Sequence, residues 1–189
     1  MHSTLLHTLN QIVKLDEEEI SIICQRFKPL TISKGDFFLQ EHAISKQVGF
    51  LQKGLVRYFV HKNDQEATFE FTKEGEFVSD YQSFNTQTPS LQNIQAIEDC
   101  ELLIISYPDL QYIFKHAPHG DMLGRVILEH RFDVMVGQLM AIYMQNQETR
   151  YRHFIQQYSD LAQRIPQYMI ASYVGIQPQS LSRIRRKAR

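Results

Sequence analysis

The chain has 189 residues, enough for one large domain or two small ones with an ample core. Its composition, 43% hydrophobic and 22% charged, is that of a globular protein. No apolar run approaches the roughly 18 residues that a membrane span needs, and the N-terminus has no charged-then-apolar signal pattern. We therefore expect a cytoplasmic protein without a membrane partner.

The net charge of −1 hides a strong asymmetry along the chain. Residues 148–189 carry eight Lys or Arg and only two acidic residues, so residues 1–147 are acidic overall. An acidic body with a basic end indicates that only the end meets a polyanion such as DNA.

The first part of the chain changes from helical to strand periodicity. Residues 3–26 have helical spacing, and the acidic run Asp16–Glu19 suits a solvated helix start. From Lys28 to Ser106, runs rich in β-branched and aromatic residues alternate with glycines and Asn-Asp. This pattern predicts antiparallel strands in a barrel or sandwich, with tight hairpin turns at Gly54 and at residues 62–65.

A short helix is predicted from Tyr107 to about His116, followed by a long helix over residues 118–147. The long helix has two apolar stripes, and a helix that is apolar on two faces must pack against two partners. The first stripe comprises Leu128, Phe132, Met135, Leu139 and Ile142. The second comprises Leu123, Ile127, His130, Val134, Gly137, Ala141 and Met144.

One of the two partners is expected to be the same helix of a second subunit, with Gly137 and Ala141 allowing close approach. The alternative is a helix buried between two domains of one chain. The dimer interface predicted on this basis is Leu123, Ile127, Val134, Gly137, Ala141 and Met144.

Residues 148–164 form another amphipathic helix, and residues 167–189 have the spacing of a helix-turn-helix. Ala171 stands where two helices approach closely, and Gly175 can adopt the left-handed conformation that ends the first of them. Pro178 suits the first turn of the second helix. Apolar contacts between the helices are expected at Ile170, Val174, Ile176, Leu181 and Ile184.

The second helix would present polar and basic side chains to DNA. Gln179, Ser180 and Arg183 are candidates for base contacts, and Arg185, Arg186 and Lys187 for phosphate contacts. An ordinary amphipathic hairpin with a basic, solvated end is the alternative, since cations are favoured near a helix C-terminus.

Five segments of the chain have a pattern in common with a known family: Ile32-Ser-Lys-Gly-Asp36, Leu51-Gln-Lys-Gly-Leu-Val-Arg57, Phe71-Thr-Lys-Glu-Gly-Glu-Phe77, Ile170-Ala-Ser-Tyr-Val-Gly-Ile and Ser180-Leu-Ser-Arg-Ile-Arg. On these segments the whole arrangement resembles the Crp/Fnr family of bacterial transcription regulators. It implies an α+β fold: an antiparallel β-roll (a double-stranded β-helix of the cyclic-nucleotide-binding type) with flanking helices, a long dimerisation helix and an all-α DNA-binding domain. The corresponding segments are residues 1–117, 118–147 and 148–189.

The resemblance implies a homodimer on a palindromic operator, a small-molecule effector in the β-roll and RNA polymerase as a further partner. Two departures are expected to matter. Where cyclic-nucleotide-binding members hold phosphate with Gly-Glu and Arg-Ser, this chain has Ser79-Asp80 and Ser90-Leu91, so cyclic AMP and cyclic GMP are disfavoured. The chain also ends at Arg189, which leaves no residues for the usual β-hairpin wing.

The residues that correspond to the effector pocket, with the aromatic residues around them, are Phe69, Phe71, Ser79, Asp80, Tyr81, Ser90 and Leu91. The same aromatic side chains could instead be simple core.

Two other function classes stay open. A sensor module could act mainly through protein partners. A cupin-like metal enzyme would need clustered ligands such as His-x-His, but His42 and His61 are separated by 19 residues. No cofactor, metal site or catalytic motif is therefore expected.

Overall fold

The computed structural model describes residues 1–187, and the chain forms two compact units. The first unit contains Met1–Tyr58 and Phe71–His130. The second contains Phe59–Glu70 and the chain from Arg131 onward. Two strands and one long helix therefore pass from one unit into the other.

In the part of the chain that the structure describes, eight strands form two four-stranded sheets, which is the predicted antiparallel β-roll. One sheet has the order β1-β8-β3-β6 and the other β2-β7-β4-β5. The strands are β1 (Lys28–Ile32), β2 (Phe37–Leu39), β3 (Gln47–Lys53), β4 (Val56–Lys62), β5 (Gln65–Thr72), β6 (Phe77–Val78), β7 (Asn93–Ala96) and β8 (Cys100–Ser106). Leu51 and Leu102, which pair across strands β3 and β8 of the first sheet, and Ile94 of the second sheet are at most 1% exposed, as opposed inner faces require.

Gly54 connects the two sheets, so the prediction of a tight hairpin at this glycine is wrong. Strand β3, before it, and strand β4, after it, belong to different sheets. Gly54 has φ = +100°, and a Cβ there would lie 2.6 Å from the carbonyl oxygen of Asp99. A glycine signals a sharp change of chain direction, but not which strand comes next to which.

The hairpin predicted at residues 62–65 is confirmed. Strands β4 and β5 are neighbours in their sheet, and Asn63 and Asp64 between them have φ values of 51° and 59°. Two consecutive left-handed residues match the right-handed twist of the flanking strands.

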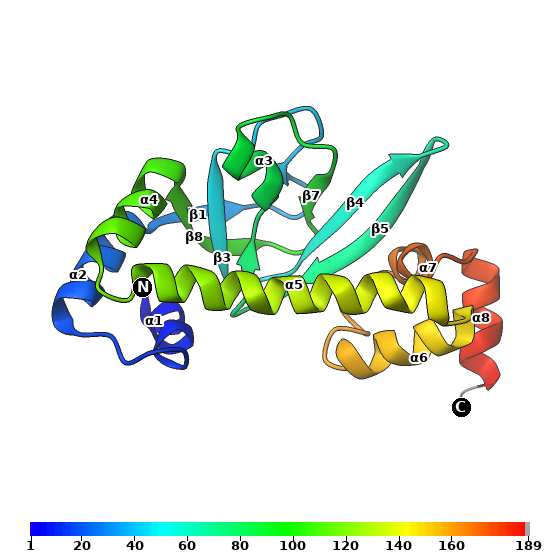
Figure 1. Cartoon of the computed structure of the whole chain (residues 1–189). Coiled ribbons are helices and arrows are strands. Elements are labelled where there is room, and N and C mark those ends of the chain that lie inside the picture. Colours follow the sequence, from blue (N-terminus) through cyan, green and yellow to red (C-terminus); the bar gives the residue numbers. More distant parts are fainter. Residues whose placement is uncertain (188–189) are drawn as a thin grey trace. The chain divides into compact units, whose positions relative to one another are not determined.

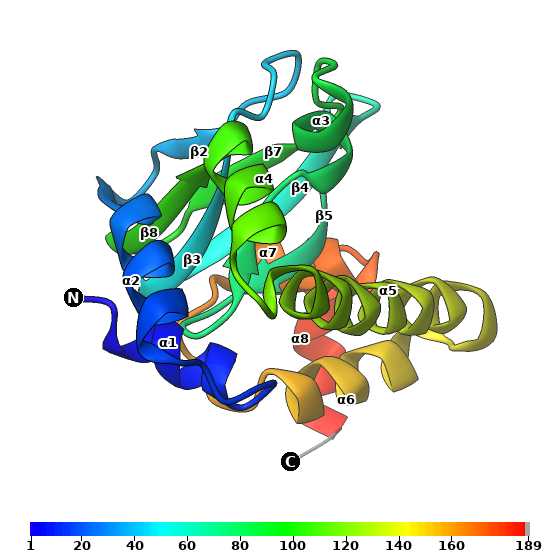
Figure 2. The same cartoon turned by 60° about the vertical axis from the view of Figure 1, so that its left-hand side comes forward.

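The helices of the first unit cover the roll and complete its core. They are α1 (Ser3–Asn10), α2 (Glu17–Arg26), α3 (Tyr81–Thr86), α4 (Tyr107–His116) and the start of α5 (Gly120–Met144). Helices α2 and α4 lie side by side, joined by an ion pair of 2.9 Å between Arg26 and Asp109 (Figures 1 and 2). Leu5, Ile23 and Phe50 form part of one buried cluster that also includes Leu123 of α5.

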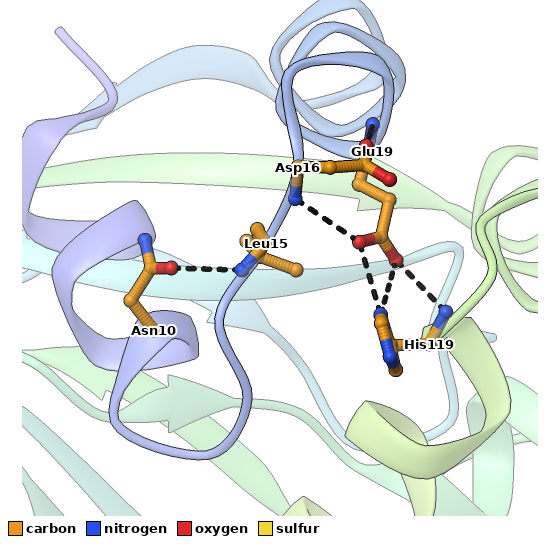
Figure 3. A network of polar contacts seen from close by, with 5 residues as sticks. All are labelled: Asn10, Leu15, Asp16, Glu19 and His119. Atoms are coloured by element: carbon orange, nitrogen blue, oxygen red, sulfur yellow. Dashed lines mark hydrogen bonds and ion pairs between the residues drawn. The ribbon is translucent and has the colours of Figure 1, made fainter.

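Glu19 connects α2 to the start of α5, although its acidic run was expected to be solvated. Its side chain is fully buried. The carboxylate accepts hydrogen bonds from the backbone N–H of Asp16 (3.3 Å), the backbone N–H of His119 (2.8 Å) and the ring of His119 (3.0 Å) (Figure 3). Asp16 in turn accepts from the backbone of Glu19, which completes a capping box.

The second unit contains the C-terminal helices. They are α6 (Gln147–Gln157), α7 (Gln167–Val174) and α8 (Pro178–Lys187). Phe154, Leu161 and Ile170 form part of their buried core. Among residues 1–187, none of the helices combines the length and apolar character that crossing a membrane requires.

Candidate nucleic-acid interface

The turn between α7 and α8 has the backbone geometry that the sequence predicts. Gly175 ends α7 in the left-handed conformation, with φ = +75°. Its N–H donates to the carbonyl of Ser172 (3.0 Å), and the N–H of Ile176 donates to the carbonyl of Ala171 (2.9 Å). These two bonds form a Schellman motif, which fixes the direction in which the chain leaves the helix. Helix α8 then begins at Pro178, as predicted.

The residues predicted to lie between the two helices are buried or half-buried. Ala171 and Val174 of α7 have no solvent exposure, and Leu181 of α8 is 1% exposed. Ile176 and Ile184 are half-buried at the edge of this contact. A larger residue than alanine at position 171 would separate the helices, because close-packed cores accommodate little extra volume.

The opposite face of α8 presents polar and cationic groups. Gln179, Arg183 and Arg186 are exposed and follow one another at intervals of four and three residues, so they share one helix face. Ser180 is half-buried beside them. A guanidinium and an amide on one helix face match the donor and acceptor pattern of base edges in a major groove.

Arg185 is half-buried, and its guanidinium donates a hydrogen bond to the side-chain oxygen of Gln167, at the start of α7. The side chain of Lys187, the third predicted phosphate contact, lies outside the described residues. The structure therefore brings Gln179, Ser180, Arg183 and Arg186 together on α8, and connects Arg185 to α7.

Two of the predicted effector residues of the first unit, Asp80 and Ser90, meet at the start of α3. Asp80 caps this helix by accepting from the N–H of Ser83 (3.1 Å), and its other oxygen accepts from the hydroxyl of Ser90 (2.7 Å). Asp80 and Ser90 are 7% and 1% exposed. The Asp80–Ser90 hydrogen bond joins the two ends of the segment 80–90. These are the positions where the resemblance implies phosphate ligands.

The other predicted effector residues have different surroundings. Ser79 is half-buried and its N–H donates to the hydroxyl of Tyr58 (3.1 Å), and Phe71 is buried. Tyr81 and Leu91 are 37% and 78% exposed. Phe69 belongs to the second unit.

Helix α5 exposes a continuous apolar face. Phe132, Met135, Leu139 and Ile142, which belong to the first predicted stripe, are 52–60% exposed. Of the predicted dimer residues, Leu123 is buried in the core of the first unit, and Ile127 packs against that core. Val134 and Ala141 are half-buried, and Gly137 and Met144 are exposed.

Three residues of the second unit make contacts that no local sequence pattern predicts. Ser172 of α7 bonds the backbone of β5, and Glu70 of β5 forms an ion pair with Arg131 of α5. Each contact joins residues about 60 to 100 positions apart, so no local pattern marks it. Among the described residues, no group of three metal-ligating side chains gathers at one place.

The comparisons with known proteins agree with this architecture. Residues 29–117 match the family model of the cyclic nucleotide-binding domain. Among curated protein sequences, none is significantly similar to this chain.

Solved structures of regulators have a similar fold. The c-di-GMP responsive global regulator CLP of Xanthomonas campestris has 17% identity and a TM-score of 0.73, covering 92% of this chain and 91% of that chain. The catabolite activator protein of Thermus thermophilus has 20% identity and a TM-score of 0.60, covering 95% and 85%. A protein from Eubacterium rectale, described as a transcriptional regulator of the Crp/Fnr family, has 15% identity and a TM-score of 0.68, covering 92% and 83%. The chain therefore has the fold of Crp/Fnr regulators, with residues 29–117 matching a cyclic nucleotide-binding domain.

Proposed function

We propose that this protein is a dimeric transcription regulator of the Crp/Fnr type that inserts α8 into the major groove of a palindromic operator. The observation that carries the proposal is the exposed face of α8. Gln179, Arg183 and Arg186 face outward from a helix whose other side is packed on α7. A recognition helix needs this combination of a fixed inner face and a polar outer face.

The proposed dimer uses α5. Two copies would bury the apolar face formed by Phe132, Met135, Leu139 and Ile142, which a single chain leaves exposed. A two-fold dimer would present two α8 helices to two half-sites of one operator.

The proposed effector is not a cyclic nucleotide. The Asp80 carboxylate already accepts from Ser90 and from the Ser83 N–H, and a phosphate placed there would meet a negative charge. The neighbour CLP is described as responsive to c-di-GMP. We expect no calorimetric binding of cyclic AMP, cyclic GMP or c-di-GMP to this chain, whereas an isotherm with one site per subunit would contradict this assignment.

The proposed function is tested by selecting bound sequences from a pool of random DNA with the purified protein. A palindrome with half-sites about one helical turn apart is expected. Failure to enrich any sequence, with negligible DNA affinity even at low salt, would favour a module that acts through protein partners.

Variants of α8 separate base contacts from phosphate contacts. Arg183→Ala should cost about 1–3 kcal/mol of binding free energy on the selected site and relax the base preference. Arg186→Ala should weaken selected and unrelated sequences alike. Lys14→Ala, at an exposed position outside the basic end, is the matched control. An Arg183→Ala protein that binds every sequence as before would remove this residue's assignment.

A further inference from the structure

Arg150 of α6 reaches the turn between α7 and α8. Helix α6 packs against α7 within the second unit (Figure 1). A Cβ built on Gly175, which ends α7, would lie 3.2 Å from a terminal nitrogen of the Arg150 guanidinium and 3.8 Å from its central carbon. The guanidinium of Arg150 therefore lies directly against the backbone of the turn.

The Arg150 guanidinium carries a donor that the described part of the chain leaves without an acceptor. Its Nε is buried and makes no hydrogen bond there. Glu148, the acidic residue of α6, pairs instead with Arg152 at 2.8 Å. A buried donor without a partner costs free energy, and more so when it carries charge. An anion with several acceptor oxygens is therefore the ligand that this side chain favours.

The place of Arg150 in the fold suits a phosphate of DNA. A recognition helix enters the major groove with its N-terminal residues on the base edges, so the turn before it runs beside the sugar-phosphate backbone. Gly175 and Gln177 of this turn are exposed, and Arg150 is half-buried beside Gly175. A guanidinium can bind phosphate with two parallel N–H groups, which fixes orientation as well as distance.

We propose that Arg150 binds a phosphate of the operator beside Gly175, a DNA contact from outside the recognition helix. This inference rests on the proposed function, because the phosphate is that of the operator. Arg150 and Gly175 lie in different helices of the unit, so no local sequence pattern marks their contact. A phosphate contact carries no base information, so Arg150 should contribute equally to binding of every DNA sequence.

Inorganic phosphate tests the anion site without DNA. We expect the amide NMR signals of Gly175 and Gln177 to shift when inorganic phosphate is added to the wild type, and to stay in place in Arg150→Gln, which keeps N–H donors but removes the charge. Arg152→Gln should respond as the wild type, because two residues turn its side chain by about 200° to another side of α6. Shifts that are missing in the wild type, or equal in Arg150→Gln, would overturn the anion site.

Titrations of the selected operator at several salt concentrations test the DNA contact. Arg150→Gln should reduce the slope of log affinity against log salt by about 1.8 in a dimer, and weaken selected and unrelated sequences by the same factor. Arg150→Lys keeps the charge and should keep the slope, and Arg152→Gln should leave it unchanged. Weaker binding with an unchanged slope in Arg150→Gln would show that Arg150 only supports the turn, which would overturn the contact.

Two further readouts separate the contact from other effects. Hydrogen exchange at the amide of Leu181, whose side chain is 1% exposed, should be the same in Arg150→Gln and the wild type if the helix pair keeps its fold. A reduced salt slope of equal size in Arg152→Gln would show an effect of net charge alone and would overturn the contact. A wild type that binds no DNA would contradict the proposed function, whereas the phosphate titration of the free protein would still decide the anion site.

Discussion

Glu19 is a carboxylate without solvent exposure, and its charge is stabilised by donors from two segments of the chain. Burial acts to raise the pKa of Glu19, but hydrogen bonds from His119 and Asp16 outweigh it and hold this pKa below its usual value of 4.5. A carboxyl group whose pKa is lowered by folding stabilises the native state above its unfolded pKa. That stabilisation is lost as the pH falls through the lower, folded pKa.

Glu19→Gln should therefore lower the free energy of unfolding by about 1–3 kcal/mol at neutral pH, because the amide has one acceptor oxygen and its NH2 group faces N–H donors. Urea unfolding between about pH 6 and pH 3 measures this. Below pH 4.5, the difference in the free energy of unfolding between the wild type and the variant should become smaller. Glu18→Gln, at an exposed neighbouring position, is the control. If the free energy of unfolding changes equally with pH in the wild type and in Glu19→Gln, the lowered pKa of Glu19 is contradicted.

Gly54 and Gly75 form a natural pair for separating backbone strain from steric overlap. Both have positive φ, but a Cβ at Gly54 would lie 2.6 Å from the Asp99 carbonyl, whereas at Gly75 nothing lies within 4 Å. Gly75→Ala should cost about 1–2 kcal/mol, from strain alone. Gly54→Ala should cost about 2–5 kcal/mol, because overpacking adds to the strain. Thermal or urea unfolding measures both changes in the free energy of unfolding. Equal losses in the two variants would show that the backbone near Gly54 can shift to avoid the overlap with the Asp99 carbonyl.

At the scale of elements, the long helix α5 combines an inner and an outer apolar side. Leu123 belongs to the core of the first unit, while Leu139 and Ile142 are more than half exposed. Apolar periodicity shows that a helix has two such sides, but it does not show which side its own chain covers. The exposed side is therefore the one on which we place the dimer contact.

Leu139→Glu should prevent dimer formation. In a two-fold dimer, residues of this face meet their own copies or near neighbours, so two buried carboxylates would face an apolar surface. We expect the dimer dissociation constant to rise by about 100-fold or more, as measured by sedimentation equilibrium. His130→Glu is the control, because nine residues place it on the opposite side of the helix. Loss of the dimer in both variants, or in neither, would contradict this choice of face.

Prediction from sequence succeeds where the determining contacts are local. Gly175 and Pro178 mark the turn between α7 and α8 because both act on the backbone of their own segment, and Asn63-Asp64 marks a hairpin for the same reason. The strand that follows Gly54 depends on pairing with β7, some 40 residues away, which no local signal encodes. The Ser172 bridge to β5 has the same origin. The face of α8 was therefore predictable, whereas the contacts that hold its unit together were not.

At the scale of the whole molecule, the charge distribution and the dimer make one joint prediction. The eight cations of residues 148–189 lie in a chain whose other residues are acidic overall, so DNA contact should be confined to the basic end. Each phosphate contact releases counterions and adds about 0.9 to the slope of log affinity against log salt. Because a dimer carries every contact twice, a single substitution removes two of them.

Arg186→Ala should therefore reduce the salt slope by about 1.8 if two subunits bind one operator, and by about 0.9 if a single subunit binds. Lys14→Ala should leave the slope unchanged, since Lys14 lies outside the basic end. Titrations of the selected operator at several salt concentrations measure all three proteins. Arg186→Ala removes a phosphate contact, whereas Leu139→Glu reduces the number of subunits on the operator. In a Leu139→Glu background, Arg186→Ala should therefore reduce the salt slope by about 0.9 instead of about 1.8. A reduction that is the same with and without Leu139→Glu would show that DNA binding does not depend on the α5 interface.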